Sequence, residues 1–210
     1  MINLLIVDDH PLIRQGLRQT FLDTTDIRVS GEAGDNASAI AEIENHYYDA
    51  VILDISLPDR SGLETLKQIK SLSPSLPVLI LSIFPESQYA IRVLKAGADG
   101  YINKESPPDE LIQAVRKIVT GGKYISPSLA EKLADNLSEI NQRPAHEILS
   151  DREFQTMLAI ASGKTVKEIA TEFNLSVKTI STYRTRILRK MHLKNNAEII
   201  CYAVRLGLVQ

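Results

Sequence analysis

Residues 50–58 read Ala-Val-Ile-Leu-Asp-Ile-Ser-Leu-Pro, and the fold of the first half of the chain can be worked out from this stretch. Its first four residues are apolar without polar alternation, which is typical of a strand buried on both faces. Similar apolar runs occur at 4–7, 27–30, 78–81 and 100–103. We therefore expect five short strands in one buried sheet.

The segments between these runs have the apolar spacing of helices, and local signals mark their ends. Ser61 begins a capping box, and Ser106 is expected to be the N-cap before Pro107. Gly97 and Gly121 follow predicted helix ends, where a left-handed residue is favoured. The alternation predicts an α/β doubly wound fold with a five-stranded parallel sheet. The predicted helices cover residues 11–23, 35–46, 62–72, 86–95 and 107–120.

The chain after Leu149 has no strand pattern, and we expect an all-α domain of four helices there. Ser150, Thr165 and Ser176 each precede a helical stretch as N-cap residues, and the first two belong to capping boxes. The predicted helices end at Gly163, near Asn174, near Met191 and at Arg205.

A polar stretch that contains Pro144 separates the two halves, which is typical of a linker. We expect one domain at 1–122 and a second at 148–210. The linker at 123–147 is expected to include a short helix at 128–137.

The composition excludes membrane-spanning and disulfide-rich proteins. The chain has 210 residues, and none of its apolar runs approaches the roughly 20 residues that a membrane span needs. The N-terminus lacks the basic and apolar regions of a signal peptide. A single cysteine, Cys201, fits a reducing compartment, so we expect a cytoplasmic protein. Cys201 lies in an apolar helical pattern, and we expect its thiol to be buried.

Charge is distributed unevenly. Residues 1–140 carry 13 basic and 20 acidic side chains, whereas residues 141–210 carry 11 basic and 6 acidic ones. The first part is therefore negative and the second positive, which suggests that the second part meets a polyanion.

Polar side chains follow four of the five predicted strands. Asp8 and Asp9 come after the first, Asp54 ends the third, Ser82 follows the fourth and Lys104 the fifth. The carboxyl ends of parallel strands meet at one edge, so we expect these groups to converge. Taken singly, such acids often cap helices or face solvent, but the complete set in register favours a common pocket.

Three carboxylates that lie close together repel one another unless a cation joins them. Mg²⁺ prefers oxygen ligands, and we expect Asp8, Asp9, Asp54 and the backbone carbonyl of Ser56 to hold it. Asp54 is then the candidate nucleophile toward a phosphoryl group. Lys104 would neutralise charge in the transition state, and Ser82 would donate a hydrogen bond to a phosphoryl oxygen.

The stretch 177–194 contains seven basic residues and no acid. With the helix before it, this stretch predicts a helix-turn-helix whose second helix enters the major groove of DNA. The helical period places Val177, Ile180, Tyr183, Ile187 and Met191 inside. Arg184 lies beside this apolar arc and is expected to reach a phosphate or an ion pair. The candidate DNA contacts are Lys178, Ser181, Thr182, Thr185, Arg186, Arg189 and Lys190. The alternative is an ordinary solvent-exposed helix of an α bundle.

Residues 1–120 resemble the receiver domain of two-component response regulators, which has a flavodoxin-like fold. The matching motifs are Asp8-Asp9-His10, Leu53 to Pro58, Gly62, Ser82, Lys95 to Ala98, and Tyr101 with Lys104. The resemblance implies that Asp54 is the phospho-acceptor and that Asp8, Asp9 and Asp54 form the Mg²⁺ site. It also implies that Ser82 and Tyr101 are switch residues: Ser82 would move toward the phosphoryl group, and Tyr101 would then turn inward. Glu105 stands where many receivers have a proline. His10 is expected to be a surface or hydrogen-bonded histidine.

Residues 149–209 resemble the DNA-binding domain of LuxR/FixJ-type regulators (the NarL type). The matching motifs are Leu149 to Glu153, Gly163, Lys167 to Ala170, Leu175-Ser176, Lys178 to Ile180 and Ile187 to Met191. Tyr183 and Phe154 depart from the residues common in that family, and neither is on the predicted DNA-reading face. The resemblance implies a homodimer that reads an inverted repeat in double-stranded DNA, with contact between domains through 197–205. The resemblance of residues 1–120 to receiver domains implies that a sensor histidine kinase is the phosphoryl donor.

Together these features predict a DNA-binding transcriptional regulator that is switched by phosphorylation. The two alternative functions of the second domain are an enzyme and a module that does not bind DNA. An enzymatic second domain would need a nucleophile and a base, and 149–210 offers no such set. A phosphorelay or protein-interaction module without DNA binding would not need the acid-free basic helix.

Overall fold

The structure is a computed structural model that describes residues 1–58, 61–126, 129–130 and 144–209. The chain divides into two compact units, Met1–Leu133 and Ala134–Gln210. Most of the predicted linker, including nearly all of the short helix expected at 128–137, lies outside the described residues.

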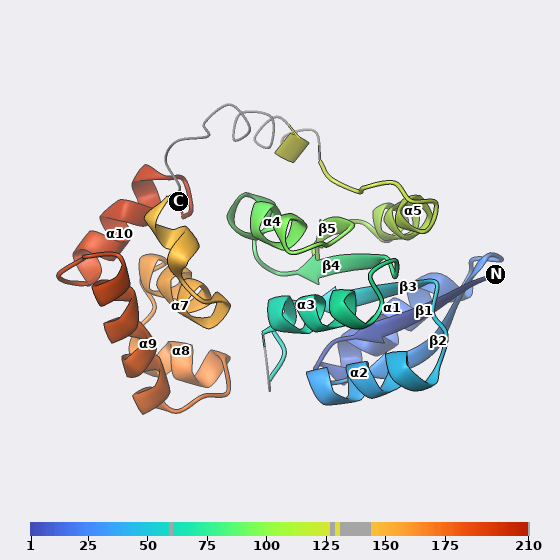
Figure 1. Ribbon diagram of the computed structural model, residues 1–210, viewed down its shortest axis with the longest axis horizontal. Coiled ribbons are helices and arrows are strands. Elements are labelled where there is room, and N and C mark those ends of the chain that lie inside the picture. Colours follow the sequence, from blue (N-terminus) through green and yellow to red (C-terminus); the bar gives the residue numbers. More distant parts are fainter. Residues whose placement is uncertain (59–60, 127–128, 131–143, 210) are drawn as a thin grey trace. The chain divides into compact units, whose positions relative to one another are not determined.

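A five-stranded parallel sheet forms the centre of the first unit (Figure 1). Its spatial order is β2-β1-β3-β4-β5. The second strand thus lies on one side of β1 and the third on the other, so the order reverses between β1 and β3, where doubly wound folds bind ligands. The strands are β1 (Ile2–Val7), β2 (Ile27–Ala33), β3 (Ala50–Asp54), β4 (Val78–Ser82) and β5 (Gly100–Asn103). The predicted fold class is confirmed.

Helices cover the sheet and bury its apolar strands. The helices α1 and α5 supply Leu17, Phe21 and Val115 to a core with the strand residues Leu4 and Ile6. Successive strand residues point to opposite faces, so Leu5 and Val7 lie on the other side of the sheet. The helices of this unit are α1 (Pro11–Leu22), α2 (Asn36–Asn45), α3 (Gly62–Leu72), α4 (Glu86–Lys95) and α5 (Pro108–Val119).

The start of α5 differs from the prediction by one residue. Ser106 was expected to be the N-cap, but Pro107 is the N-cap and the helix begins at Pro108. A residue before proline is disfavoured in the helical region, so Pro108 keeps Pro107 in an extended conformation with ψ of 146°. The predicted glycine ends are correct, since Gly97 and Gly121 have φ of 104° and 82°.

The chain after α5 returns to the edge of the sheet. Tyr124 forms a parallel bridge with Gly100 in β5, and its carbonyl accepts a hydrogen bond from the Tyr101 amide at 3.1 Å. Ser126 then donates its amide and hydroxyl hydrogens to the carboxylate of Glu86, the first residue of α4. The segment that leaves the receiver-like unit is therefore held against β5 and α4.

The second unit is helical within its described residues. Ser150 and Thr165 cap α7 and α8 in the reciprocal arrangement predicted from the sequence, and Ser176 caps α9. The helix α7 packs against α9 and α10, and α8 packs against α9. The elements are η1 (Ala145–Ile148), α7 (Asp151–Ala161), α8 (Val166–Glu172), α9 (Val177–Lys190) and α10 (Asn196–Arg205).

The expectation of a buried thiol at Cys201 is wrong, because this side chain is exposed. The helix α10 buries Ile199 and Ala203, which are four residues apart on one face. Cys201 lies midway between them in sequence and therefore on the opposite face. None of the helices in the described ranges is both long and apolar enough to cross a membrane.

Gly62, the first residue of α3, allows a close approach to the end of β3. A Cβ atom there would lie 2.2 Å from the Asp54 carbonyl oxygen and 2.6 Å from the Ile55 Cα. We predict that Gly62→Ala destabilises the first unit by about 1–3 kcal/mol, the usual cost of overpacking a filled site. Urea unfolding followed by circular dichroism measures this change.

Gly16→Ala is the matched control, because a Cβ at this position in α1 has no neighbour within 4 Å. It should stabilise the helix by up to roughly 1 kcal/mol. Equal unfolding midpoints for Gly62→Ala and the unmodified chain would contradict the close packing described here.

Candidate functional site

Three carboxylates meet at the carboxyl edge of the sheet. Asp8 and Asp9 directly follow β1, and Asp54 is the last residue of β3, the neighbour of β1. Ligand atoms of Asp8, Asp9, His10 and Asp54 lie within 4.8 Å of one another. Asp8 and Asp54 are only 1% and 2% exposed. The expected meeting of the three carboxylates is present, and His10 joins them.

Lys104 bridges the two most buried carboxylates. Its Nζ lies 2.6 Å from Asp8 Oδ2 and 2.9 Å from Asp54 Oδ2. Lys104 follows β5, and neighbouring strands are about 4.8 Å apart, so its long side chain has to pass the end of β4 to reach β3. The Lys104 amide donates to the carbonyl of Ser82 at 2.8 Å, which fixes the start of the side chain.

One lysine does not fully compensate two buried carboxylates. Burial raises the pKa of Asp54 above its ordinary value; the charge of Lys104 opposes this shift, and the charge of Asp8 adds to it. Burial also acts against the charged form of Lys104, but the neighbouring Asp54 and Asp8 outweigh it and raise the pKa of the lysine. The pocket therefore favours a further cation beside its carboxylates.

Backbone amides orient the carboxylates. The amide of Ser56 donates to Asp54 Oδ1 at 3.1 Å, and the amide of His10 donates to Asp8 Oδ1 at 2.8 Å. The sequence analysis assigned only the carbonyl of Ser56 to the pocket, whereas the structure adds its N–H group. Arg14 in α1 donates to the Asp8 carbonyl at 2.6 Å and so supports the loop after β1.

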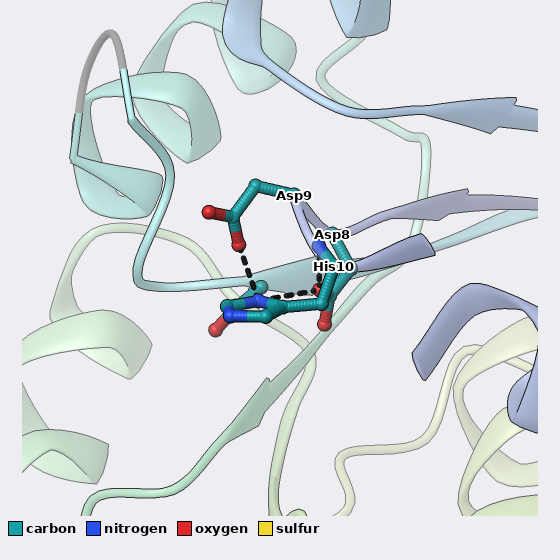
Figure 2. A group of neighbouring side chains, drawn as sticks. Asp8, Asp9 and His10 are labelled. Carbon is teal, nitrogen blue, oxygen red and sulfur yellow. Dashed lines mark hydrogen bonds and ion pairs between the residues drawn. The ribbon is translucent and has the colours of Figure 1, made fainter. Parts of the chain in front are cut away.

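Asp9 and His10 face one another at the rim of the pocket, as Figure 2 shows. His10 Nδ1 lies 2.7 Å from Asp9 Oδ1, and the histidine side chain is 65% exposed. Asp9 Oδ1 is buried, and among the described residues no donor forms a hydrogen bond of good geometry with it. A buried carboxylate oxygen whose close neighbour is a largely exposed histidine, and which lies beside two further carboxylates, fits the oxygen ligands of a divalent cation.

Ser82 and Tyr101 belong to a second hydrogen-bonded group next to the pocket. Ser82 Oγ accepts the amide hydrogen of Phe84 at 3.1 Å, and the Tyr101 hydroxyl donates to the Phe84 carbonyl at 2.6 Å. Tyr101 is only 2% exposed, and burial raises the pKa of its hydroxyl. Tyr101 is therefore buried in this structure, and its expected turn inward after phosphorylation stays a prediction.

The outer face of α9 carries most of the predicted DNA-contacting residues. Lys178, Ser181, Thr182, Thr185, Arg186 and Arg189 are all exposed. Ser176 Oγ accepts the Thr179 amide at 3.0 Å and fixes the start of the helix. An exposed helix face with the three cations Lys178, Arg186 and Arg189 and no acid can bind phosphates.

Lys190 is placed differently from the other candidate contacts. Its Nζ lies 2.6 Å from Glu153 Oε2 in α7, and both side chains are largely covered. Burial alone would raise the pKa of Glu153, but its hydrogen bonds with Lys190 and Ser150 lower it. Lys190 therefore joins α9 to α7 in this structure.

One expectation for α9 needs correction, and one of its side chains has a neighbour that the sequence did not predict. Val177 was placed inside, but it is 46% exposed, because it begins the helix beside an open hollow lined by Lys167 and Thr171 of α8. Arg184 Nε donates to Asn196 Oδ1 at 2.6 Å, and the phosphate contact expected for this side chain stays a prediction. The helical period predicts the direction of each side chain around the helix axis. It does not predict which neighbouring element covers that side chain.

Comparison with known proteins identifies both units. The model of the response regulator receiver domain matches residues 4–116, and that of the bacterial regulatory proteins of the luxR family matches residues 147–203. The response regulator UvrY of Escherichia coli is 36% identical over 211 residues, which cover 99% of this chain and 96% of UvrY. The response regulator GacA of Pseudomonas aeruginosa is 33% identical over 210 residues, which cover 100% of this chain and 98% of GacA.

Solved structures agree with this result. RcsB of Salmonella enterica serovar Typhimurium, bound to promoter rprA in the presence of the phosphomimetic BeF3−, matches over the whole of both chains with a TM-score of 0.64 and 26% identity. A LuxR-family response regulator from Aurantimonas matches with a TM-score of 0.61 and 32% identity, over 66% of this chain and 99% of that one. This chain is a DNA-binding transcriptional regulator of a two-component system and belongs to the response regulators that join a receiver domain to a LuxR-family DNA-binding domain.

Proposed function

We propose that Mg²⁺-dependent phosphorylation of Asp54 switches the DNA binding of this chain. The observation that carries the proposal is the buried Asp54 carboxylate, held 2.9 Å from the Lys104 ammonium beside Asp8 and Asp9. We place the receiver at 1–122 and the DNA-binding domain at 148–210, joined by the linker 123–147.

The carboxylates of Asp8, Asp9 and Asp54, with the Ser56 carbonyl, would hold one Mg²⁺ ion. The donor set suits this ion, because carboxylate and carbonyl oxygens are its usual protein ligands. When bound, the ion supplies positive charge that stabilises both the ionised carboxylates and a phosphoryl group.

Asp54 acts as the nucleophile in the proposed transfer. One carboxylate oxygen bonds to the phosphorus of a sensor kinase phosphohistidine or of a small acyl phosphate, and the donor's bond to phosphorus breaks. Lys104 stays close to the phosphoryl oxygens and offsets their charge, while Ser82 donates its hydroxyl hydrogen to one of them. The receiver thus promotes its own phosphorylation, and the output of the chain remains DNA binding.

The switch would begin at Ser82. When its hydroxyl turns to the phosphoryl group, the Phe84 amide loses its acceptor, and the Tyr101–Phe84 hydrogen bond is disturbed with it. The loop between β4 and α4 then changes its hydrogen bonds. This is a local change at one end of α4.

The output would be a homodimer in the cytoplasm that binds an inverted repeat in double-stranded DNA. Lys178, Arg186 and Arg189 would neutralise phosphates, while Ser181, Thr182 and Thr185 would face the bases. Lys190 would join them where its pair with Glu153 opens. The helix α10 would be the contact between DNA-binding domains.

Asp54→Asn should abolish incorporation of labelled phosphate from acetyl phosphate, because an amide is not a nucleophile toward phosphorus. Autoradiography of the full chain measures this. Asp26→Asn, an acid before β2 that pairs with Arg116, is the control and should keep its label. Persistent labelling of Asp54→Asn would move the acceptor to another residue.

Asp9→Ala should remove the Mg²⁺-dependent rise in the melting temperature of the unphosphorylated chain, because it deletes one of three carboxylate ligands. His10→Ala is the neighbouring control and should keep the Mg²⁺ response, since Mg²⁺ prefers oxygen to nitrogen ligands. An unchanged Mg²⁺ response in Asp9→Ala would show that Asp9 is not a ligand.

Arg189→Ala should reduce the dependence of DNA affinity on salt, by roughly 0.9 in the slope of log K against log salt, the value for one lost phosphate contact. Gel shifts with genomic fragments over a salt series provide the slopes, and Lys67→Ala in α3 should leave the slope unchanged. An identical slope for Arg189→Ala would argue against its phosphate contact.

If the unmodified chain retained no fragment at low salt in either phosphorylation state, a protein-interaction module would replace this proposal.

A further inference from the structure

The exposed side chain of Val177 is the feature of α9 that its basic character does not explain. It is 46% exposed at the first position of the helix, between the N-cap Ser176 and the exposed Lys178. An apolar side chain forms no favourable interaction with a phosphate. Its burial against another apolar group lowers the free energy of the complex, because apolar surface is removed from water. Its position therefore suggests an apolar partner within the DNA.

Val177 lies on the same line along the helix as two of the proposed base-facing residues. Ser181 and Thr185 follow it at intervals of four residues, and side chains with this spacing lie one above another. In helix-turn-helix proteins the first residues of the recognition helix come close to base edges. Val177 thus begins the row that would enter the groove in the proposed complex.

The neighbouring threonines also present methyl groups. Thr182 Oγ1 donates to the Lys178 carbonyl at 2.9 Å, and Thr185 Oγ1 donates to the Ser181 carbonyl at 3.0 Å. Their hydroxyl hydrogens are used within the helix, which leaves the methyl group and the oxygen lone pairs for a partner. The outer face of α9 therefore combines methyl groups with the surrounding cations Lys178, Arg186 and Arg189.

The base edge that fits a methyl-rich surface is thymine, whose 5-methyl group projects into the major groove. We propose that Val177 is a specificity residue that packs against a thymine methyl group in each half-site. This assignment rests on the proposed DNA binding of α9 and adds the base that the start of this helix prefers.

Uracil substitution tests the assignment. A bound fragment is selected with the full-length chain in Mg²⁺ and acetyl phosphate, and each thymine of its binding site is replaced by deoxyuridine in turn. The unmodified chain should lose affinity about fourfold at the thymine that Val177 contacts, the effect of one buried methyl group. Val177→Ala should bind the unmodified site about four- to tenfold more weakly and should show no further loss at that position.

Two further variants make the readout specific. Val177→Ile keeps a branched apolar side chain and should keep the loss at the same thymine. Ile148→Ala removes an exposed apolar side chain from the same unit, outside α8 and α9, and should match the unmodified chain throughout. Circular dichroism of Val177→Ala should show an intact helix, because alanine is the better helix former.

Identical uracil profiles for Val177→Ala and the unmodified chain would overturn the role of Val177 and leave DNA binding intact. Absence of any uracil effect in the unmodified chain would overturn it too. Failure of the unmodified chain to retain any fragment would overturn both this assignment and the proposed function.

Discussion

Two buried carboxylates, on Asp8 and Asp54, share the ammonium group of Lys104, which is the only cation paired with them among the described lysines and arginines, and the proposed site depends on this charge balance. The order of the strands creates it, because β1 and β3 are neighbours and each ends in an acid. Asp9 adds a third carboxylate at the rim. Such a pocket suits the cation and the phosphoryl group of the proposed function, since both would change its charge balance.

Hydrogen bonds, together with the backbone from Phe84 to Glu86, connect this pocket to the segment that leaves the receiver. Lys104 is tied to Ser82 through the backbone, and Ser82 and Tyr101 meet at Phe84. The loop that contains Phe84 leads into α4, whose first residue, Glu86, holds Ser126. A change at Ser82 therefore has a short chemical route to the start of the connection between the two units.

In the proposed DNA complex, the helix α9 would separate affinity from specificity along its length. Cations on the outer face of α9 suit phosphates, while Val177 and the threonine methyl groups suit the edge of a base. Capping by Ser176 and the pair between Lys190 and Glu153 hold the helix at both ends. A helix that is held at both ends can present its cations and its methyl groups to DNA in one fixed orientation.

The sequence by itself determined the sheet, the helices and the meeting of Asp8, Asp9, Asp54 and Lys104, because the carboxyl ends of parallel strands must share an edge. It also identified the acid-free basic helix. Only the tertiary structure decided which side chains are covered: Val177 and Cys201 are exposed, and Arg184 and Lys190 bond to neighbouring helices. Periodicity fixes the direction of a side chain from its own helix, whereas burial and pairing depend on the element that packs against it.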